Sequence, residues 1–182
     1  MDADAVSALG IAVRAAAGLL FLEAALGKLA HGARFEGVVA NYRILPEPLV
    51  GVTARLLPPF ELALAVALLA SPLLGGLAPW PALGGAGLLA VFAAAMGANL
   101  ARGRSEIDCG CGRGGLRQPL SWGRVGRNLV LAGLLLATVP LGGASAAAWL
   151  VGLAAGAGLF VLDYALACLG ALGPRRAAGG AR

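Results

Sequence analysis

Long apolar stretches separated by short polar intervals are the dominant pattern in this sequence of 182 residues. A helix rises about 1.5 Å per residue, so about 20 apolar residues span a hydrocarbon core about 30 Å thick. Five stretches meet this requirement and predict membrane-spanning helices at about 8–30, 50–74, 77–101, 124–140 and 144–170. The regular alternation of polar and apolar residues that a β-barrel needs is not the pattern here.

An amphipathic segment follows the first predicted span, at residues 31–49. Its apolar residues recur at helical spacing, and they are Phe35, Val38, Val39 and Tyr42. Its arginine and glutamate residues lie on the other faces of the predicted helix. Such a helix is expected to lie along the membrane interface. The second span is entered through the run L-P-P-F-E at 57–61, whose two prolines predict a kinked or broken first turn.

The composition indicates a membrane protein rather than a soluble domain. Hydrophobic residues make up 59% of the chain and charged residues 13%, which lies outside the range of soluble globular proteins. Alanine, leucine and glycine dominate, which favours helices that pack closely through small side chains. We therefore predict an all-α polytopic membrane protein, a bundle of about five transmembrane helices that forms one domain over residues 1–173. Residues 174–182 are expected to be a disordered tail.

The basic residues gather at one end of this predicted bundle. With five spans, thirteen of the fourteen lysines and arginines fall on one face, and only Arg14 lies nearer the other. The positive-inside rule assigns the basic face to the cytoplasm, so we expect the amino terminus outside the cytoplasmic membrane of a prokaryote. The net charge of +5 follows from this topology and gives no reason to expect nucleic acid as a partner.

The same topology brings several polar side chains to one depth in the bilayer. Charges in lipid must pair, so we expect Glu61 or Asp163 to meet Arg127 or Lys28 beneath the polar loop that follows the third span. Holding helices together, or snorkelling to the interface, is the alternative role. The predicted supporting cluster comprises Lys28, Glu61, Asn99, Arg102, Arg104, Asp108, Arg127, Asn128 and Asp163.

That polar loop, residues 102–123, holds two of the three cysteines, Cys109 and Cys111, with one glycine between them. Two thiols at this spacing can close a small disulfide ring or bind a metal, and both uses depend on the thiolate. Nearby arginines favour the thiolate, whereas Asp108 and Glu106 oppose it. Flanking glycines free the backbone for a tight ring and leave room for a partner protein. We expect a redox pair, on the cytoplasmic side by the charge distribution.

Other uses of these residues stay open at this point. Cys168, near the end of the last span, is a candidate third thiol that resolves a mixed disulfide, with a buried apolar cysteine as the alternative. Cys109, Cys111 and His31 are the alternative metal ligands, in a non-enzymatic metal-binding or transport protein. Structural zinc sites favour two to four residues between paired cysteines, which counts against that site. A membrane assembly scaffold is the third interpretation.

Six short strings together resemble the MauE family of methylamine utilisation membrane proteins, over about residues 10–140. The family is similar to DoxX-like redox-associated membrane proteins, which implies a four-helix core plus one further helix. The strings are A-L-G-K-L at 25–29, N-Y-R-I-L-P at 41–46, L-P-P-F-E-L at 57–62, N-L-A-R-G-R at 99–104, D-C-G-C at 108–111 and R-N-L-V-L at 127–131.

The resemblance implies a part in maturing the small, disulfide-rich subunit of methylamine dehydrogenase, together with a thioredoxin-like partner outside the cytoplasmic membrane. Cys109 and Cys111 would then be the exchanging pair of a thiol–disulfide oxidoreductase, although whether the chain is itself an enzyme stays open. An exported client and a cytoplasmic loop point to opposite sides of the membrane. Electrons that cross between them would need a quinone, a moving loop or another subunit, so a quinone is the candidate cofactor.

Overall fold

The computed structural model describes residues 2–71, 79–110, 118–141 and 144–172, and its secondary structure there is helical, with no strand beyond one isolated bridge. The predicted all-α class is confirmed. The predicted tail, residues 174–182, lies outside the described residues. The helices are α1 Ala3–Ala30, α2 Gly32–Tyr42, α3 Glu47–Leu69, α4 Pro79–Ala101, α5 Trp122–Ala137 and α6 Ala146–Leu172.

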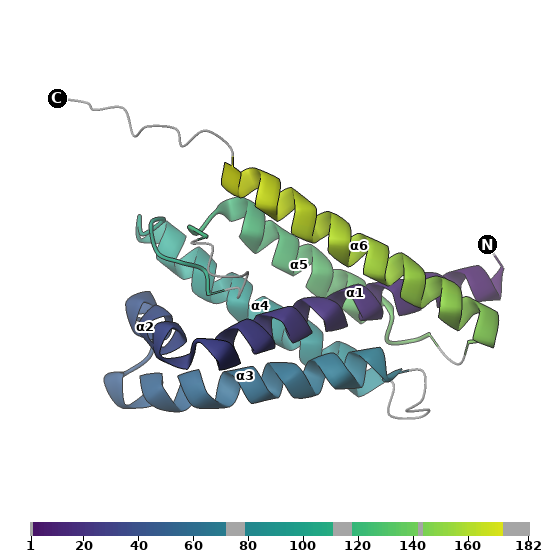
Figure 1. Cartoon of the computed structure of the whole chain (residues 1–182), viewed down its shortest axis with the longest axis horizontal. Coiled ribbons are helices and arrows are strands. Elements are labelled where there is room, and N and C mark those ends of the chain that lie inside the picture. The colour runs from purple at the N-terminus through teal and green to yellow at the C-terminus, as the bar shows by residue number, and fades with distance from the viewer. Residues whose placement is uncertain (1, 72–78, 111–117, 142–143, 173–182) are drawn as a thin grey trace.

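Four of these helices, α1, α3, α4 and α6, are long and apolar enough to cross a membrane within the described part of the chain. The chain is therefore a multi-pass membrane protein. Helix α5 has 16 residues and extends roughly 24 Å, which is shorter than a typical hydrocarbon core. It nevertheless runs beside the longer helices within the bundle (Figure 1). A fifth crossing by α5 stays a prediction.

Helix α1 lies at the centre of the bundle and contacts α2, α3, α5 and α6 (Figure 1). Small residues account for its closest contact. A β-carbon on Gly156 of α6 would lie 2.6 Å from the carbonyl oxygen of Ala12 in α1, and one on Gly152 would lie 2.7 Å from that of Ala8. The two backbones can approach so closely because these positions lack side chains.

Helix α3 differs from the prediction at its start. It begins at Glu47 rather than near Val50, and Pro48 lies in its first turn. Proline is well tolerated there because its fixed φ suits the helix and its missing N–H would have no partner. Pro58 and Pro59 therefore lie inside the helix, which continues to Leu69. A broken first turn at these prolines is wrong, and a kink there stays a prediction.

Local contacts define the start of α5 and the orientation of α2. The hydroxyl of Ser121 caps α5 by accepting a hydrogen bond from the N–H of Arg124 at 3.4 Å. The amphipathic segment forms helix α2, and Phe35 on its apolar face is buried. That face turns toward the bundle, because Phe35, Val38 and Tyr42 line a cavity between the helices. Placement of α2 along the membrane interface stays a prediction.

Candidate functional site

The loop that holds Cys109 is tied to the segment before α5 by backbone hydrogen bonds. Asp108 and Pro119 form an antiparallel bridge, and the N–H of Cys109 donates to the carbonyl of Gln118 at 2.8 Å. The Asp108 carboxylate accepts from the N–H of Gly110 at 3.3 Å and from the N–H of Gln118 at 3.4 Å. Asp108, predicted as a supporting residue, therefore shapes the backbone next to the cysteine.

Cys109 itself is partly buried and disulfide-bonded. Its sulfur lies 3.9 Å from the side-chain oxygen of Gln118, and Gln118 is only 5% exposed. Gly110 has a φ of +71°, and a β-carbon there would lie 3.0 Å from Val38 of α2. Both the left-handed backbone and the close approach to α2 require glycine at this position. Cys111, predicted as the second exchanging thiol, lies outside the described residues.

Helix α2 is fastened to this loop at its carboxyl end. The Tyr42 hydroxyl donates to the carbonyl of Cys109 at 3.1 Å. The Arg104 guanidinium donates to the carbonyls of Asn41 at 2.7 Å and Tyr42 at 3.3 Å, and Arg102 reaches the carbonyl of Arg43 at 3.5 Å. Both arginines thus donate hydrogen bonds to carbonyls at the carboxyl end of α2, which have no partners within the helix.

The environment of Tyr42 keeps its phenol protonated. Burial, with a contribution from the negative charge of Asp108, raises the pKa of Tyr42, because both disfavour the phenolate. The neutral hydroxyl is the form that donates to the Cys109 carbonyl. The hydrogen bond between α2 and the loop is therefore retained across the physiological pH range.

A cavity of about 300 Å³ lies beneath the loop, bounded by α1, α2, α3, α4 and the start of α5. Most of its wall is apolar. Cys109 and Gly110 of the loop form part of it, as do the polar side chains of Glu23, Lys28, Glu61, Arg127 and Asn128. Four members of the predicted supporting cluster therefore share this cavity wall with Cys109: Lys28, Glu61, Arg127 and Asn128.

Lys28 of α1 and Glu61 of α3 form an ion pair in the wall of this cavity, where they are 5% and 0% exposed. The Lys28 ammonium also lies over two aromatic rings, 5.2 Å from the centre of Phe35 and 5.3 Å from that of Phe92. Ring faces attract cations, so this arrangement compensates part of the lost hydration of the ammonium. The pairing expected from their common depth is confirmed.

Arg127 of α5 and Asp163 of α6 form the second expected pair, with 3.1 Å between a guanidinium nitrogen and a carboxylate oxygen. Arg127 also donates to the side chain of Asn128 at 3.4 Å, and Asn128 is 2% exposed. Asn99 is fully buried, donates to the carbonyl of Ala95 and accepts from Arg104 at 2.9 Å. The ion pair thus links α5 to α6, and Asn99 links α4 to the loop.

Two polar atoms of the cavity residues are buried without a hydrogen-bond partner among the described residues. One is Oε2 of Glu61, an acceptor, and the other is Nε of Arg127, a donor. Buried polar atoms in folded proteins nearly always have a partner, and leaving one without a partner costs about 1–3 kcal/mol. Each of these atoms can therefore form one further hydrogen bond.

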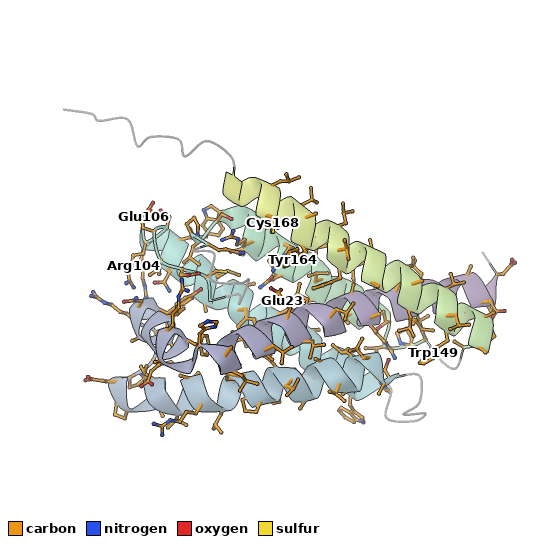
Figure 2. All side chains as sticks on the ribbon, viewed as in Figure 1. Glu23, Arg104, Glu106, Trp149, Tyr164 and Cys168 are labelled. Carbon is orange, nitrogen blue, oxygen red and sulfur yellow. The ribbon has the colours of Figure 1, made fainter. Side chains whose placement is uncertain are left out.

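The remaining candidate residues lie apart from this set. Cys168 is a free cysteine on α6, at the end of the bundle where the loop lies (Figure 2). His31 is exposed between α1 and α2, and its ring lies 3.2 Å from the carbonyl of Gly27. Among the residues that the structure describes, no three His, Cys, Asp or Glu side chains are placed to hold a metal ion.

Several residues of the site were not predicted from the sequence as site residues. Gln118 is brought to Cys109 by the backbone bridge, which no sequence pattern announces. Phe35 and Phe92 contact Lys28 from different helices, and only the apolar face of α2 hinted at the first. Glu23 lies in the cavity wall, and the signal for it was a carboxylate inside a predicted span.

Comparison with known proteins identifies the family of this chain. The sequence model described as "Methylamine utilisation protein MauE" matches residues 6–142. The chain belongs to the MauE family. A relative named "Methylamine utilization protein MauE" from Paracoccus denitrificans is 46% identical over 168 residues, covering 88% of this chain and 87% of the relative.

Further relatives with the same printed name support this assignment. The protein from Methylorubrum extorquens is 45% identical over 158 residues, covering 87% of this chain and 78% of its own. The protein from Paracoccus versutus is 42% identical over 171 residues, covering 90% of this chain and 88% of its own. No solved structure gives a significant match.

The strings that resemble the MauE family converge on one region of the structure. Each string supplies at least one side chain to the cavity wall or to the contacts that hold the cysteine loop. In chain order these residues are Lys28, Tyr42, Glu61, Arg104, Cys109 and Arg127. Strings that are far apart in the sequence therefore describe one site.

Proposed function

We propose that this MauE-family chain is the membrane component of a thiol–disulfide pathway that supports the maturation of exported proteins. The observation that carries the proposal is a disulfide-bonded Cys109 in a loop that is pinned by Gln118, Asp108 and Tyr42 at the end of a membrane bundle. A disulfide accepts electrons from a thiol when an attacking thiolate can reach one of its sulfurs.

The exchanging pair in this proposal is Cys109 and Cys111. The thiolate of a thioredoxin-like partner attacks one sulfur of the disulfide and forms a mixed disulfide, while the other sulfur leaves as a thiolate. A second thiol of the partner then attacks the mixed disulfide and releases the partner in its oxidised form. The chain is left with two thiols, having gained two electrons and two protons, and the oxidised partner passes its disulfide to the client.

The printed names of the relatives refer to methylamine utilisation. The client that agrees with this context is the small, disulfide-rich subunit of methylamine dehydrogenase. Cys168, free and near the same end of the bundle, is a candidate third thiol in this scheme. The supporting residues would act by holding the loop and α2 in place, as the contacts of Arg104 and Asp108 suggest.

Serine substitutions test the exchanging pair directly. C109S and C111S should each abolish formation of disulfides in the reduced client, because each leaves only one sulfur of the pair. C168S tests the candidate third thiol separately, because it removes Cys168 and leaves both sulfurs of the pair. The measurement is the free-thiol content of the client over time. Normal client oxidation by C109S or C111S would overturn the proposal.

The side of the membrane on which the cysteine loop lies determines where the partner acts. The distribution of basic residues predicts a cytoplasmic loop, whereas direct exchange with the partner of an exported client requires the loop on the opposite side. Labelling of single cysteines in a cysteine-free variant with a membrane-impermeant reagent distinguishes the two. Ser105→Cys marks the loop, and Ala144→Cys marks the start of α6 at the opposite end; both positions are exposed. Labelling of position 105 from outside intact cells would refute the cytoplasmic assignment and put the pair on the side of an exported client.

A further inference from the structure

The cavity below Cys109 has the properties of a binding site for a lipophilic small molecule. Its volume of about 300 Å³ is at the lower end of the range for small-molecule pockets, and its wall is mostly apolar with a few polar groups. Val91 and Ile44, which also line it, are 61% and 43% exposed, so the cavity reaches the outer apolar surface of the bundle. A ligand can thus enter from the lipid and leave a hydrocarbon tail there.

The polar atoms in the wall define the head group of this ligand. Oε2 of Glu61 lacks a donor and Nε of Arg127 lacks an acceptor among the described residues, and Glu61 is fully buried. The Lys28 ammonium has three N–H groups, of which one is directed to Glu61. The site therefore suits a molecule with oxygen atoms that accept hydrogen bonds in one state and donate them in another.

The aromatic side chains and the cysteine in the wall further restrict the class of ligand. Phe35 and Phe92 offer ring faces next to Lys28, and such faces stack with a flat ring. Cys109 contributes to the same wall, which places a residue of the proposed exchanging pair next to the ligand. An acyl chain of a phospholipid would fill the apolar volume but would leave both polar atoms without partners.

We propose that this cavity binds a lipid-soluble quinone, which reoxidises the cysteine pair. This inference rests on the proposed function, because it supplies the electron acceptor which that function requires. Two thiols lose two electrons and two protons as the sulfur–sulfur bond forms, and the quinone gains the same two electrons and two protons to become a hydroquinone. Arg127 and Lys28 donate to the carbonyl oxygens of the quinone, and Glu61 accepts from a hydroxyl of the hydroquinone.

Filling the cavity tests the binding site. Ala95 of α4 lines the cavity, whereas its neighbour Ala94 is exposed and does not. Purified protein in detergent should bind decylubiquinone, with a stoichiometry of one per chain, measured by equilibrium dialysis. Ala95→Phe should weaken this binding by about tenfold or more, because the phenyl ring occupies the space of the ligand. Ala94→Phe adds the same side chain and should bind like the unaltered protein.

A polar variant and a redox measurement separate this inference from the proposed function. Glu61→Gln keeps the size of the side chain and should weaken retention of the hydroquinone more than that of the quinone, since an amide oxygen is the weaker acceptor. Reduced protein mixed with decylubiquinone should lose two thiols per hydroquinone formed, and Ala95→Phe should slow this step. Client oxidation by protein that was oxidised beforehand with diamide requires no quinone and should be unchanged in Ala95→Phe.

The outcomes are distinguishable. If Ala95→Phe and Ala94→Phe bind decylubiquinone equally, or if the unaltered protein does not bind it, the quinone site is refuted, while client oxidation by the diamide-treated protein still stands. If binding is saturable and lost in Ala95→Phe but no thiols are consumed, the proposed electron transfer is refuted. If diamide-treated protein fails to oxidise the client, the proposed function itself is wrong, whatever the binding result.

Discussion

The ammonium of Lys28 in α1 and the carboxylate of Glu61 in α3 form an ion pair that is almost completely removed from solvent, with 5% and 0% exposure. Because the two residues come from different spanning helices, the pair fixes the relative depth of α1 and α3. It also places a cation close to the faces of two aromatic rings at the wall of the cavity.

Breaking this pair should destabilise the protein. Lys28→Met and Glu61→Leu each leave one buried charge without its partner, and such changes cost about 3–5 kcal/mol in proteins. The double variant should lose less than the sum of the single losses, because it leaves neither charge. Thermal unfolding of the purified protein in detergent measures the effect. Arg55→Met, at an exposed position of α3, is the control, and single variants as stable as this control would contradict the prediction.

The contact between α1 and α6 should depend on glycine at position 156. Gly156→Leu forces a side chain against the carbonyl oxygen of Ala12, which belongs to a helix backbone and cannot move away. Overpacking of this kind costs about 1–3 kcal/mol or separates the helices. Gly158→Leu makes the same change two residues later, where a β-carbon would meet nothing within 4 Å. Thermal unfolding should distinguish the two, and equal stability would show that α6 does not pack through Gly156.

The fastening of α2 should depend on Arg104 more than on Arg102. Arg104 donates to two backbone carbonyls and to Asn99, whereas Arg102 makes one contact at 3.5 Å. Arg104→Ala should therefore raise amide hydrogen exchange in α2, and Arg102→Ala should change it little. Mass spectrometry of peptides that cover Gly32–Tyr42 gives the measurement. Unchanged exchange in Arg104→Ala would mean that these hydrogen bonds do not hold α2.

The Tyr42 hydroxyl should make stability depend on pH only in alkaline solution. The folded protein holds this proton more tightly than the unfolded chain, because the pKa of Tyr42 is raised above its ordinary value of 10.0. Its contribution is therefore complete below about pH 10 and is lost as the pH rises toward the folded pKa. Tyr42→Phe should cost about 1 kcal/mol at neutral pH through the lost hydrogen bond to Cys109.

Absorbance of tyrosinate checks the same prediction. The chain has two tyrosines, so Tyr164→Phe leaves Tyr42 as the one that is observed. Its titration should be displaced above pH 10 in the folded protein and return to the ordinary range after denaturation. A midpoint near the ordinary value in the folded state would show that Tyr42 is not buried against the loop.

Part of the site could be predicted because it depends on depth in the membrane. The charged residues of the two ion pairs lie in predicted spans whose direction alternates along the chain, which places them at a common depth: Lys28, Glu61, Arg127 and Asp163. The cost of a charge in lipid then requires them to pair. The start of α5 at Ser121 was predictable for a local reason, since a serine before a helix accepts from its first N–H groups.

The cavity could not be predicted, because it depends on how α2 folds back over the bundle. Amphipathic spacing identified the apolar face with Phe35 and Tyr42, but the sequence does not say whether lipid or protein covers it. The course of α3 was misjudged for a related reason. Prolines at 58 and 59 weaken a helix locally, yet packing of Leu64 and Leu68 against the core holds α3 continuous through them.

Arg104 and Tyr42 join α2 to the cysteine loop, so helix and loop form a single cover over the cavity. A displacement of the loop should therefore also displace α2 and change the wall of the cavity. Binding of a partner protein at the loop and binding of a ligand in the cavity would then be thermodynamically coupled, because both act on the same cover.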